Sequence, residues 1–247
     1  MKKIYDKNEL NFALIWIGIY VVLMSVGENI SGTIGIAKAV TAPICVVLTL
    51  IMYFWISKNE LKEKYGLCAF DASAKQFLYF VPLMLLVSTN LWWGFQLNLT
   101  LGETVLYVIS MLCVGFLEEV IFRGFLFKAI CKTNVKQAVI ISSVTFGIGH
   151  IVNLLNGRDI PETLMQICYA VAIGFLFTII FYKRKSLWPC IITHSVMNSL
   201  SVFANEDVIT IYKHLAGCVF LCIVSIGYAV YILCMAEKAD IRKGESS

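Results

Sequence analysis

Long apolar stretches separated by short polar segments make up most of this chain. Eight of these stretches approach the length of about 20 residues that a helix needs to cross a hydrocarbon core about 30 Å thick. They cover residues 10–26, 39–56, 77–95, 104–127, 137–155, 164–182, 187–204 and 215–235. Because they are too long and too uniformly apolar for barrel strands, the pattern predicts an all-α polytopic membrane bundle of about eight transmembrane helices.

The composition agrees with this class. Hydrophobic residues make up 59% of the chain and charged residues 15%, and the mean hydropathy is +0.80. No Pro- or Ser-rich linker divides the chain, so we expect one integral domain in the cell membrane, surrounded by the lipid bilayer. The sequence gives no indication of the oligomeric state.

The positions of the Lys and Arg residues predict the orientation. With a cytoplasmic N-terminus, 16 of the 20 fall in cytoplasmic segments, namely 2–7, 58–75, 128–136, 183–185 and 238–243. Only Lys38, Arg158 and Lys213 fall on the other side, and Arg123 lies within the membrane. Since short cytoplasmic loops carry an excess of Lys and Arg, both termini are predicted to be cytoplasmic. The net charge of +4 then reflects orientation, and no nucleic-acid partner is expected.

The stretch 104–127 contains three charged residues, Glu118, Glu119 and Arg123. A charged side chain at the centre of a bilayer costs roughly 2.5 to 3.5 kcal/mol, so such a residue is by default a candidate for function. Glu119 and Arg123 are four residues apart and can pair on one helix face. Glu118 points about 100° away and lacks that partner. A low dielectric disfavours the charged form of such a carboxylate, as a general base near neutral pH requires.

Two further helices carry polar residues at a similar depth. His150 lies in the predicted helix 137–155, and His194 and Asn198 lie four residues apart in the helix 187–204. At about 1.5 Å of rise per residue, Glu118 lies about 15 Å from the cytoplasmic end, His194 about 14 Å, and Asn198 and His150 about 20 Å. The four side chains can therefore meet near the middle of the membrane. The first three predicted helices and the last contribute little at this depth.

This set of residues suits peptide-bond hydrolysis. Glu118 and His150 could hold and deprotonate a water, while His194 and Asn198 could donate hydrogen bonds to the oxyanion of the tetrahedral intermediate. Alternatively, Glu118, His150 and His194 could bind a divalent metal such as zinc. The chain has neither a His-Glu-x-x-His motif nor a Cys-x-x-Cys pair, so a mechanism without a cofactor is the first choice. A serine route through Ser195 is weaker because adjacent helix residues do not face each other.

Three motifs carry a family resemblance: Glu118-Glu119-Val-Ile-Phe-Arg123, Phe146-Gly-Ile-Gly-His150 and His194-Ser-Val-Met-Asn198. With them the sequence resembles the CAAX protease and bacteriocin-processing family (CPBP or Abi family) of intramembrane endopeptidases. The resemblance divides the chain into N-terminal transmembrane helices (1–103), a catalytic core (104–204), and a last helix with a cytoplasmic tail (205–247). It implies that Glu118 and His150 activate the water and that His194 and Asn198 form the oxyanion site. Glu119 and Arg123 would orient the helix or contact the substrate.

The predicted activity is hydrolysis of a peptide bond in a membrane-associated or short peptide precursor. We expect this peptide to enter from the membrane or the cytoplasmic side, and a short peptide precursor is a better candidate substrate than a prenylated protein. One alternative is a non-catalytic immunity or scaffold protein of the same family. Another is a small transporter that uses Glu118 and Arg123 as a relay, but the chain shows no inverted repeat.

Overall fold

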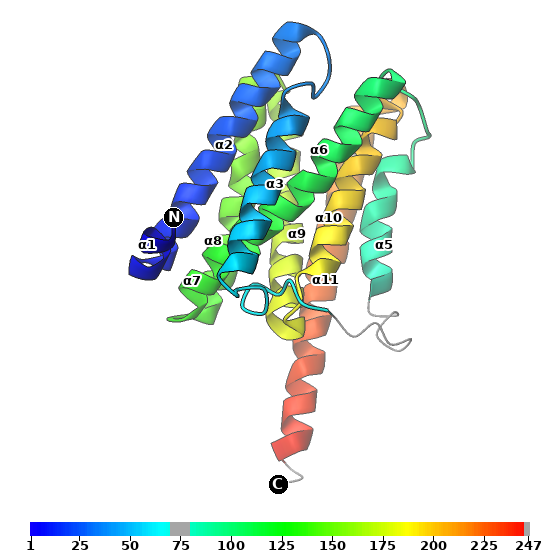
Figure 1. The fold of residues 1–247 in the computed structure, drawn as a ribbon. Helices are drawn as coiled ribbons and strands as arrows, with labels where there is room; N and C mark the ends of the chain where they lie inside the picture. Colours follow the sequence, from blue (N-terminus) through cyan, green and yellow to red (C-terminus); the bar gives the residue numbers. More distant parts are fainter. Residues whose placement is uncertain (70–79, 245–247) are drawn as a thin grey trace.

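The computed structural model describes residues 1–69 and 80–244 as a bundle of α-helices (Figure 1). Apart from an isolated bridge between Phe95 and Ala204, these residues contain no strand. The α-helices are α1 (Lys2–Lys7), α2 (Glu9–Ile34), α3 (Thr41–Lys58), α5 (Val81–Ser88), α6 (Leu101–Glu119), α7 (Lys128–Cys131), α8 (Val135–Gly149), α9 (Ile160–Arg184), α10 (Trp188–Leu200) and α11 (Ile211–Gly244). The shorter helical turns are η2 (Thr89–Leu91), η3 (Val120–Phe127), η4 (His150–Asn156), η5 (Ser201–Phe203) and η6 (Glu206–Val208).

The all-α fold and the multi-pass membrane class are confirmed. Each predicted apolar stretch is helical over most of its described residues, although residues 92–95 of the third stretch lie outside helices. Residues 77–79 of the same stretch lie outside the described part. Six of the described helical runs are long and apolar enough to cross a membrane. The third and seventh stretches form shorter helices, Val81–Leu91 and α10. The count of eight full crossings therefore stays a prediction.

Local sequence explains where several helices begin and end. Thr100 and Glu103 form a capping box at the start of α6, and Asn8 and Asn134 cap α2 and α8 through their side chains. Gly35 ends α2 in the left-handed conformation that glycine adopts without strain. Beyond Glu119, α6 continues into the π-helical η3, and π-helical turns are often found at functional sites.

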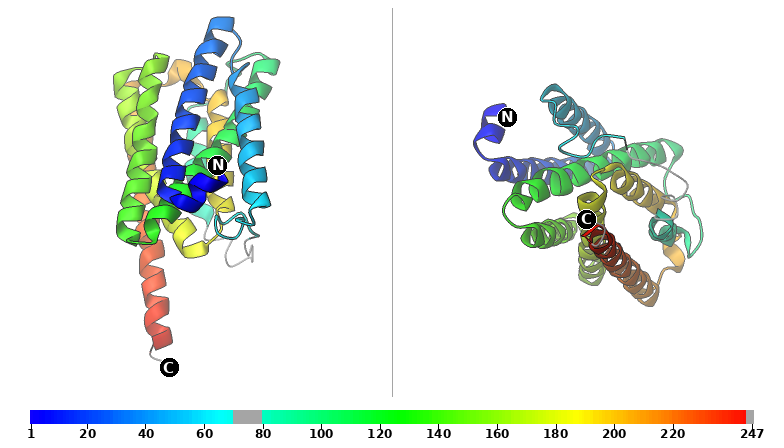
Figure 2. Two further views of the ribbon diagram at one scale, coloured as in Figure 1. Left: turned by 60° about the vertical axis from the view of Figure 1, so that its left-hand side comes forward. Right: turned by 90° about the horizontal axis from the view of Figure 1, so that it is seen from below.

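The two termini lie toward the same end of the bundle (Figure 1). At this end, Glu9 pairs with Lys64 at 2.6 Å and with Lys132 at 2.9 Å, so three segments distant in sequence meet there. In the view from below, α9 lies between α8 and α11 (Figure 2), and it packs against both helices. The described parts of three segments predicted to be cytoplasmic, 2–7, 58–69 and 128–136, therefore lie together at one end.

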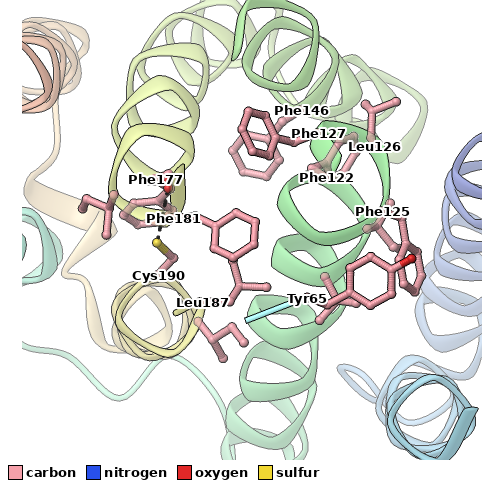
Figure 3. Close-up of a cluster of buried hydrophobic side chains, with 14 of the residues drawn as sticks. Tyr65, Phe122, Phe125, Leu126, Phe127, Phe146, Phe177, Phe181, Leu187 and Cys190 are labelled. Atoms are coloured by element: carbon pink, nitrogen blue, oxygen red, sulfur yellow. Dashed lines mark hydrogen bonds between the residues drawn. The ribbon is translucent and has the colours of Figure 1, made fainter. Parts of the chain in front are cut away.

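A cluster of buried, mainly aromatic side chains packs between the helices (Figure 3). Tyr65, Phe125, Phe127 and Phe181 are each no more than 2% exposed. The rings of Tyr65 and Phe125 meet edge to face at 4.9 Å, and those of Phe127 and Phe181 lie 6.0 Å apart. Leu187, which is fully buried, completes this group. We call these five residues the aromatic seal, because they fill the space between the helices toward the terminus end.

Candidate active site

A cavity of about 520 Å³ lies mainly in the half of the bundle away from the termini. Glu118, Phe122, Phe146, Phe177 and His194 line its deep part. Further lining residues include Tyr20, Lys38, Tyr107, Gly149, His150, Val152, Asn156, Arg158, Asn198 and Lys213. All three predicted segments of the chain, 1–103, 104–204 and 205–247, contribute to this lining. The predicted core thus does not enclose the cavity by itself.

Glu119 and Arg123 form the predicted ion pair. Their side chains are fully buried, and Arg123 Nη1 lies 3.2 Å from Glu119 Oε1. The guanidinium also lies over the ring of Phe146, 4.1 Å from its centroid, a distance at which a cation is attracted to an aromatic face. Removing one partner of a buried pair leaves an uncompensated charge, which typically costs about 3 to 5 kcal/mol. The pair therefore fixes the position of the helix that carries Glu118.

His194 bridges the two glutamates. Its Nδ1 lies 2.8 Å from Glu119 Oε1, and its Nε2 lies 3.4 Å from Glu118 Oε2. A carboxylate that accepts a hydrogen bond from one ring nitrogen fixes both the orientation and the tautomer of the imidazole. With a proton on Nδ1 directed to Glu119, Nε2 faces Glu118 at the cavity. The sequence did not indicate that Glu119 would serve His194 as well as Arg123.

Glu118 has a partner that the sequence did not reveal. The hydroxyl of Tyr20, on α2, donates a hydrogen bond of 2.7 Å to Glu118 Oε1. The interpretation that the first three helices contribute little at this depth is therefore wrong. Glu118 does lack an Arg123 contact, as predicted, but it is held between Tyr20 and His194. Its Oε2 has no hydrogen-bond partner in the described part of the chain and lies at the cavity.

His150 and Asn198 line the same cavity. His150 begins η4, directly after the α8 helix ends at Gly149, and its ring meets the edge of Phe146 at 5.5 Å. Among the hydrogen bonds of residues 1–69 and 80–244, none involves the His150 ring or the Asn198 amide. The structure therefore brings the four predicted residues to one cavity and leaves two of them free to contact a bound molecule.

A close approach of two helices positions His194. A Cβ atom at Gly115 would lie 2.7 Å from the backbone nitrogen of Ser195, so only glycine allows α6 and α10 to pack this closely. The Ser195 hydroxyl donates to the carbonyl of Leu112 on α6 at 3.1 Å. The Ser195 side chain therefore joins α6 and α10 and does not line the cavity. This position gives no support to Ser195 as a nucleophile.

The arrangement fits a divalent metal only in part. Glu118 Oε2 and His194 Nε2, 3.4 Å apart, have about the separation of two ligands on one tetrahedral zinc with bonds near 2.1 Å. The described residues nevertheless contain no group of three or more His, Cys, Asp or Glu side chains arranged to hold an ion. His150 lines the cavity but is not part of such a group. The predicted metal set of Glu118, His150 and His194 is therefore incomplete in this arrangement.

The central region of the chain is similar to a family of endopeptidases and to one further membrane protein. Residues 100–200 match the family model described as Rce1-like, type II CAAX prenyl endopeptidase Rce1-like. The predicted family resemblance is confirmed for this region. The chain is also 32% identical over 109 residues to a Bacillus subtilis (strain 168) protein named "Putative membrane peptidase YdiL". That match covers 44% of this chain and 40% of the relative.

The matched family region contains Glu118, Glu119, Arg123, His150 and His194, and also Asn198. It therefore supports an intramembrane peptidase at the level of the family. Tyr20 lies outside residues 100–200, so neither the motifs nor the family match points to it. The chain spans less than half the length of the relative it matches, so the reaction, substrate and partners of this protein are matters of proposal.

Proposed function

We propose that this protein is an intramembrane endopeptidase in which Glu118 activates a water to hydrolyse a peptide bond. One observation carries the proposal. Glu118 presents an unpartnered oxygen to a cavity of about 520 Å³ while Tyr20 holds its other oxygen, and His194 and Asn198 face the same space. This is a fixed base beside hydrogen-bond donors, which is what attack on a carbonyl requires.

The first step forms the tetrahedral intermediate. Glu118 Oε2 takes a proton from the water, and the resulting hydroxide attacks the carbonyl carbon of the peptide bond. The electron pair of the C=O bond moves to its oxygen, which becomes an oxyanion. His194 Nε2–H and the Asn198 amide donate hydrogen bonds to this oxyanion. His150, with its ring free, accepts or relays a hydrogen bond from the water.

The second step breaks the peptide bond. Glu118 gives the proton to the departing nitrogen, the C–N bond breaks, and the products are a carboxyl group and an amine. Glu119 holds His194 Nδ1 at 2.8 Å and orients the ring, so that Nε2 stays directed at the oxyanion during both steps. Arg123 compensates the charge of Glu119. In this scheme Glu119 and Arg123 are positioning residues, because neither lines the cavity.

A carboxylate-to-amide substitution tests the proposal. Glu118→Gln keeps the size of the side chain and removes the base, so cleavage should fall by at least about a thousandfold. The measurement is mass spectrometry of the peptides in cells that carry the wild-type protein or the variant, at equal protein level in the membrane. A peptide present only with the wild type identifies both the activity and its substrate.

The matched control is Glu162→Gln, in the first turn of α9 and outside the cavity lining. It should leave the peptide profile unchanged. Full cleavage by Glu118→Gln would disprove the role of Glu118. A phenotype retained by this variant without any difference in peptides would instead support the non-catalytic immunity or scaffold protein of this family.

The choice between water activation by Glu118 alone and a metal-bound water needs a separate measurement. If a divalent metal binds, Glu118 and His194 would hold it, and it would polarise the water and the carbonyl. We propose the metal-free route because no third ligand completes the set in the described residues. Activity that survives exhaustive dialysis against a chelator supports this choice, and activity that is lost and then restored by zinc contradicts it.

A further inference from the structure

We propose that the peptide reaches Glu118 from the non-cytoplasmic side of the membrane, through the end of the bundle opposite the termini. This inference rests on the proposed function and names its substrate class: a peptide segment exposed on the non-cytoplasmic surface. It differs from the predicted access from the membrane or the cytoplasmic side. The cavity, the aromatic seal and the distribution of charge each support it.

The cavity lining comes mainly from the parts of the helices away from the termini, and on α2 and α9 it extends to about the middle of the helix. On α2, which runs away from the terminus end, the lining begins at Tyr20 and continues to Glu28. On α9 and α11, which run back toward that end, it stops at Phe177 and Leu221. Within the described ranges, the lining takes nothing from 1–19, 39–69, 80–88, 123–145, 178–193 or 222–244. The described part of the terminus end therefore contributes no lining to the cavity.

The mouth of the cavity is exposed. Asn156 and Arg158, beside the loop between η4 and α9, are solvent-exposed and line it, together with Lys213 at the start of α11. From this mouth the lining is continuous to His150 and on to Glu118. In this proposal, the mouth is the entry for water and for an extended peptide.

The aromatic seal closes the other route. Tyr65, Phe125, Phe127, Phe181 and Leu187 are almost completely buried between Glu118 and the terminus end. Interiors packed in this way leave few voids larger than a water molecule, so a peptide can pass only if the helices separate. The backbone nitrogen of Leu187 also donates to the carbonyl of Gly66 at 2.8 Å, which ties the loop after α3 across this end.

Charge identifies the closed end as cytoplasmic. Of the 20 Lys and Arg residues, 16 belong to the segments predicted to be cytoplasmic, whereas Lys38, Arg158 and Lys213 line the cavity in its outer half. Glu9 pairs with Lys64 and Lys132, and Lys64 also donates to the Tyr5 hydroxyl at 2.6 Å, so three of the positively charged segments lie together in space. Since positively charged loops stay in the cytoplasm, the mouth faces the opposite compartment.

Thiol labelling tests the inference without knowledge of the substrate. Val152→Cys places a reporter in the cavity, two residues from His150, and Lys58→Cys places one on the exposed terminus end of α3. A charged, membrane-impermeant methanethiosulfonate is added either to intact cells or to inverted membrane vesicles. Peptide mass spectrometry then measures the labelled fraction of each introduced cysteine. The peptides distinguish this labelling from labelling of the native cysteines.

We expect at least about tenfold more labelling of Val152→Cys in intact cells than in inverted vesicles, and the reverse for Lys58→Cys. The matched control is Ile148→Cys, half exposed on the outer face of α8 but absent from the cavity lining, and the charged reagent should label it from neither side. Labelling of Val152→Cys from the vesicle side, from both sides equally or from neither side would overturn the inference.

The same labelling is repeated in the Glu118→Gln background. Because Glu118 is not needed for the cavity to open, the pattern should be unchanged there. A normal labelling pattern together with an unchanged peptide profile would disprove the catalytic role alone. Cleavage that depends on Glu118, together with labelling of Val152→Cys only from the cytoplasmic side, would disprove the access route alone.

Discussion

The two ends of this bundle are built differently although both consist of apolar helices. Toward the termini, the aromatic seal fills the interior, and the backbone nitrogen of Leu187 donates to the carbonyl of Gly66 in the loop after α3. Toward the other end, the helices surround a cavity of about 520 Å³ whose mouth carries exposed polar residues. The acidic pair Glu118 and Glu119 lies at the boundary between these two halves.

The difference gives the adjacent glutamates opposite tasks. Glu119 is fully buried, pairs with Arg123 and lies within hydrogen-bond distance of His194, so it belongs to the packed structure. Glu118 lies one residue earlier and directs an oxygen into the cavity. Because a helix turns by about 100° per residue, the Glu119 carboxylate faces the packed interior and the Glu118 carboxylate faces the cavity. Substitutions of Glu119 should therefore mainly lower the stability of the protein, and substitutions of Glu118 should mainly lower its activity.

The largest expected effect tests this separation. Glu119→Gln keeps the size of the side chain but leaves the buried Arg123 cation uncompensated, so the free energy of unfolding should fall by about 3 to 5 kcal/mol. Glu118→Gln should change it by less than about 1 kcal/mol, because this side chain reaches the cavity and its loss leaves no buried cation. The measurement is unfolding of the purified proteins in mixed detergent micelles at increasing dodecyl sulfate.

A double variant controls for nonspecific damage to the helix. Adding Arg123→Met to Glu119→Gln removes the unpaired charge, and replacing a buried ion pair by neutral groups is often close to neutral. The double variant should recover at least about half of the lost stability. Equal losses for Glu118→Gln and Glu119→Gln, or no recovery in the double variant, would contradict the assignment of Glu119 to the packed half.

Local sequence patterns predicted the helices, the buried ion pair and the grouping of four polar side chains. The apolar stretches predicted the helices because a bilayer demands a minimum length of apolar helix. The Glu119 and Arg123 pair was predictable because residues four apart share a helix face. The depths counted from the cytoplasmic ends correctly brought Glu118, His150, His194 and Asn198 to one cavity.

The sequence did not predict the contacts between distant segments. Tyr20 and Glu118 are 98 residues apart, and a tyrosine in an apolar helix carries no signal that distinguishes a hydrogen-bond donor from a packing residue. The contact between His194 and Glu119 depends on the close approach at Gly115, which becomes visible only once α6 and α10 are packed. The position of the cavity likewise depends on how the helices pack around it, and periodicity contains no information about that.

Alanine substitutions at two glycines, Gly66 and Gly149, test whether the terminus half is tightly packed and the cavity half is open. Gly66 has φ +67°, and a Cβ there would lie 2.5 Å from the Phe181 ring and 2.7 Å from the Lys185 carbonyl oxygen. Gly66→Ala should therefore lower the free energy of unfolding by about 2 to 3 kcal/mol, through backbone strain and overlap. At Gly149, which lines the cavity, an added Cβ would have no neighbour within 4 Å. Gly149→Ala should change stability by less than about 1 kcal/mol, and equal losses in the same micelle assay would contradict the contrast.

The smallest expected effect concerns the hydrogen bond that Tyr20 on α2 donates to Glu118. Tyr20→Phe removes the hydroxyl that donates to Glu118 Oε1, so the carboxylate gains freedom and the cleavage rate should fall about tenfold, which corresponds to roughly 1.4 kcal/mol. The loss should appear in kcat with little change in KM, since Tyr20 acts through Glu118. The rate is measured on the substrate that the peptide comparison identifies.

Tyr107→Phe is the matched control for this support, because the Tyr107 hydroxyl contacts Ser201 at 2.9 Å and lies on the same cavity without touching Glu118. Its cleavage rate should stay within about twofold of the wild type, since the substitution removes a hydroxyl from the lining but leaves the base held by Tyr20. Equal rates for the two variants would show that the Tyr20 hydroxyl does not position Glu118, and that the packed half holds the base without help from α2.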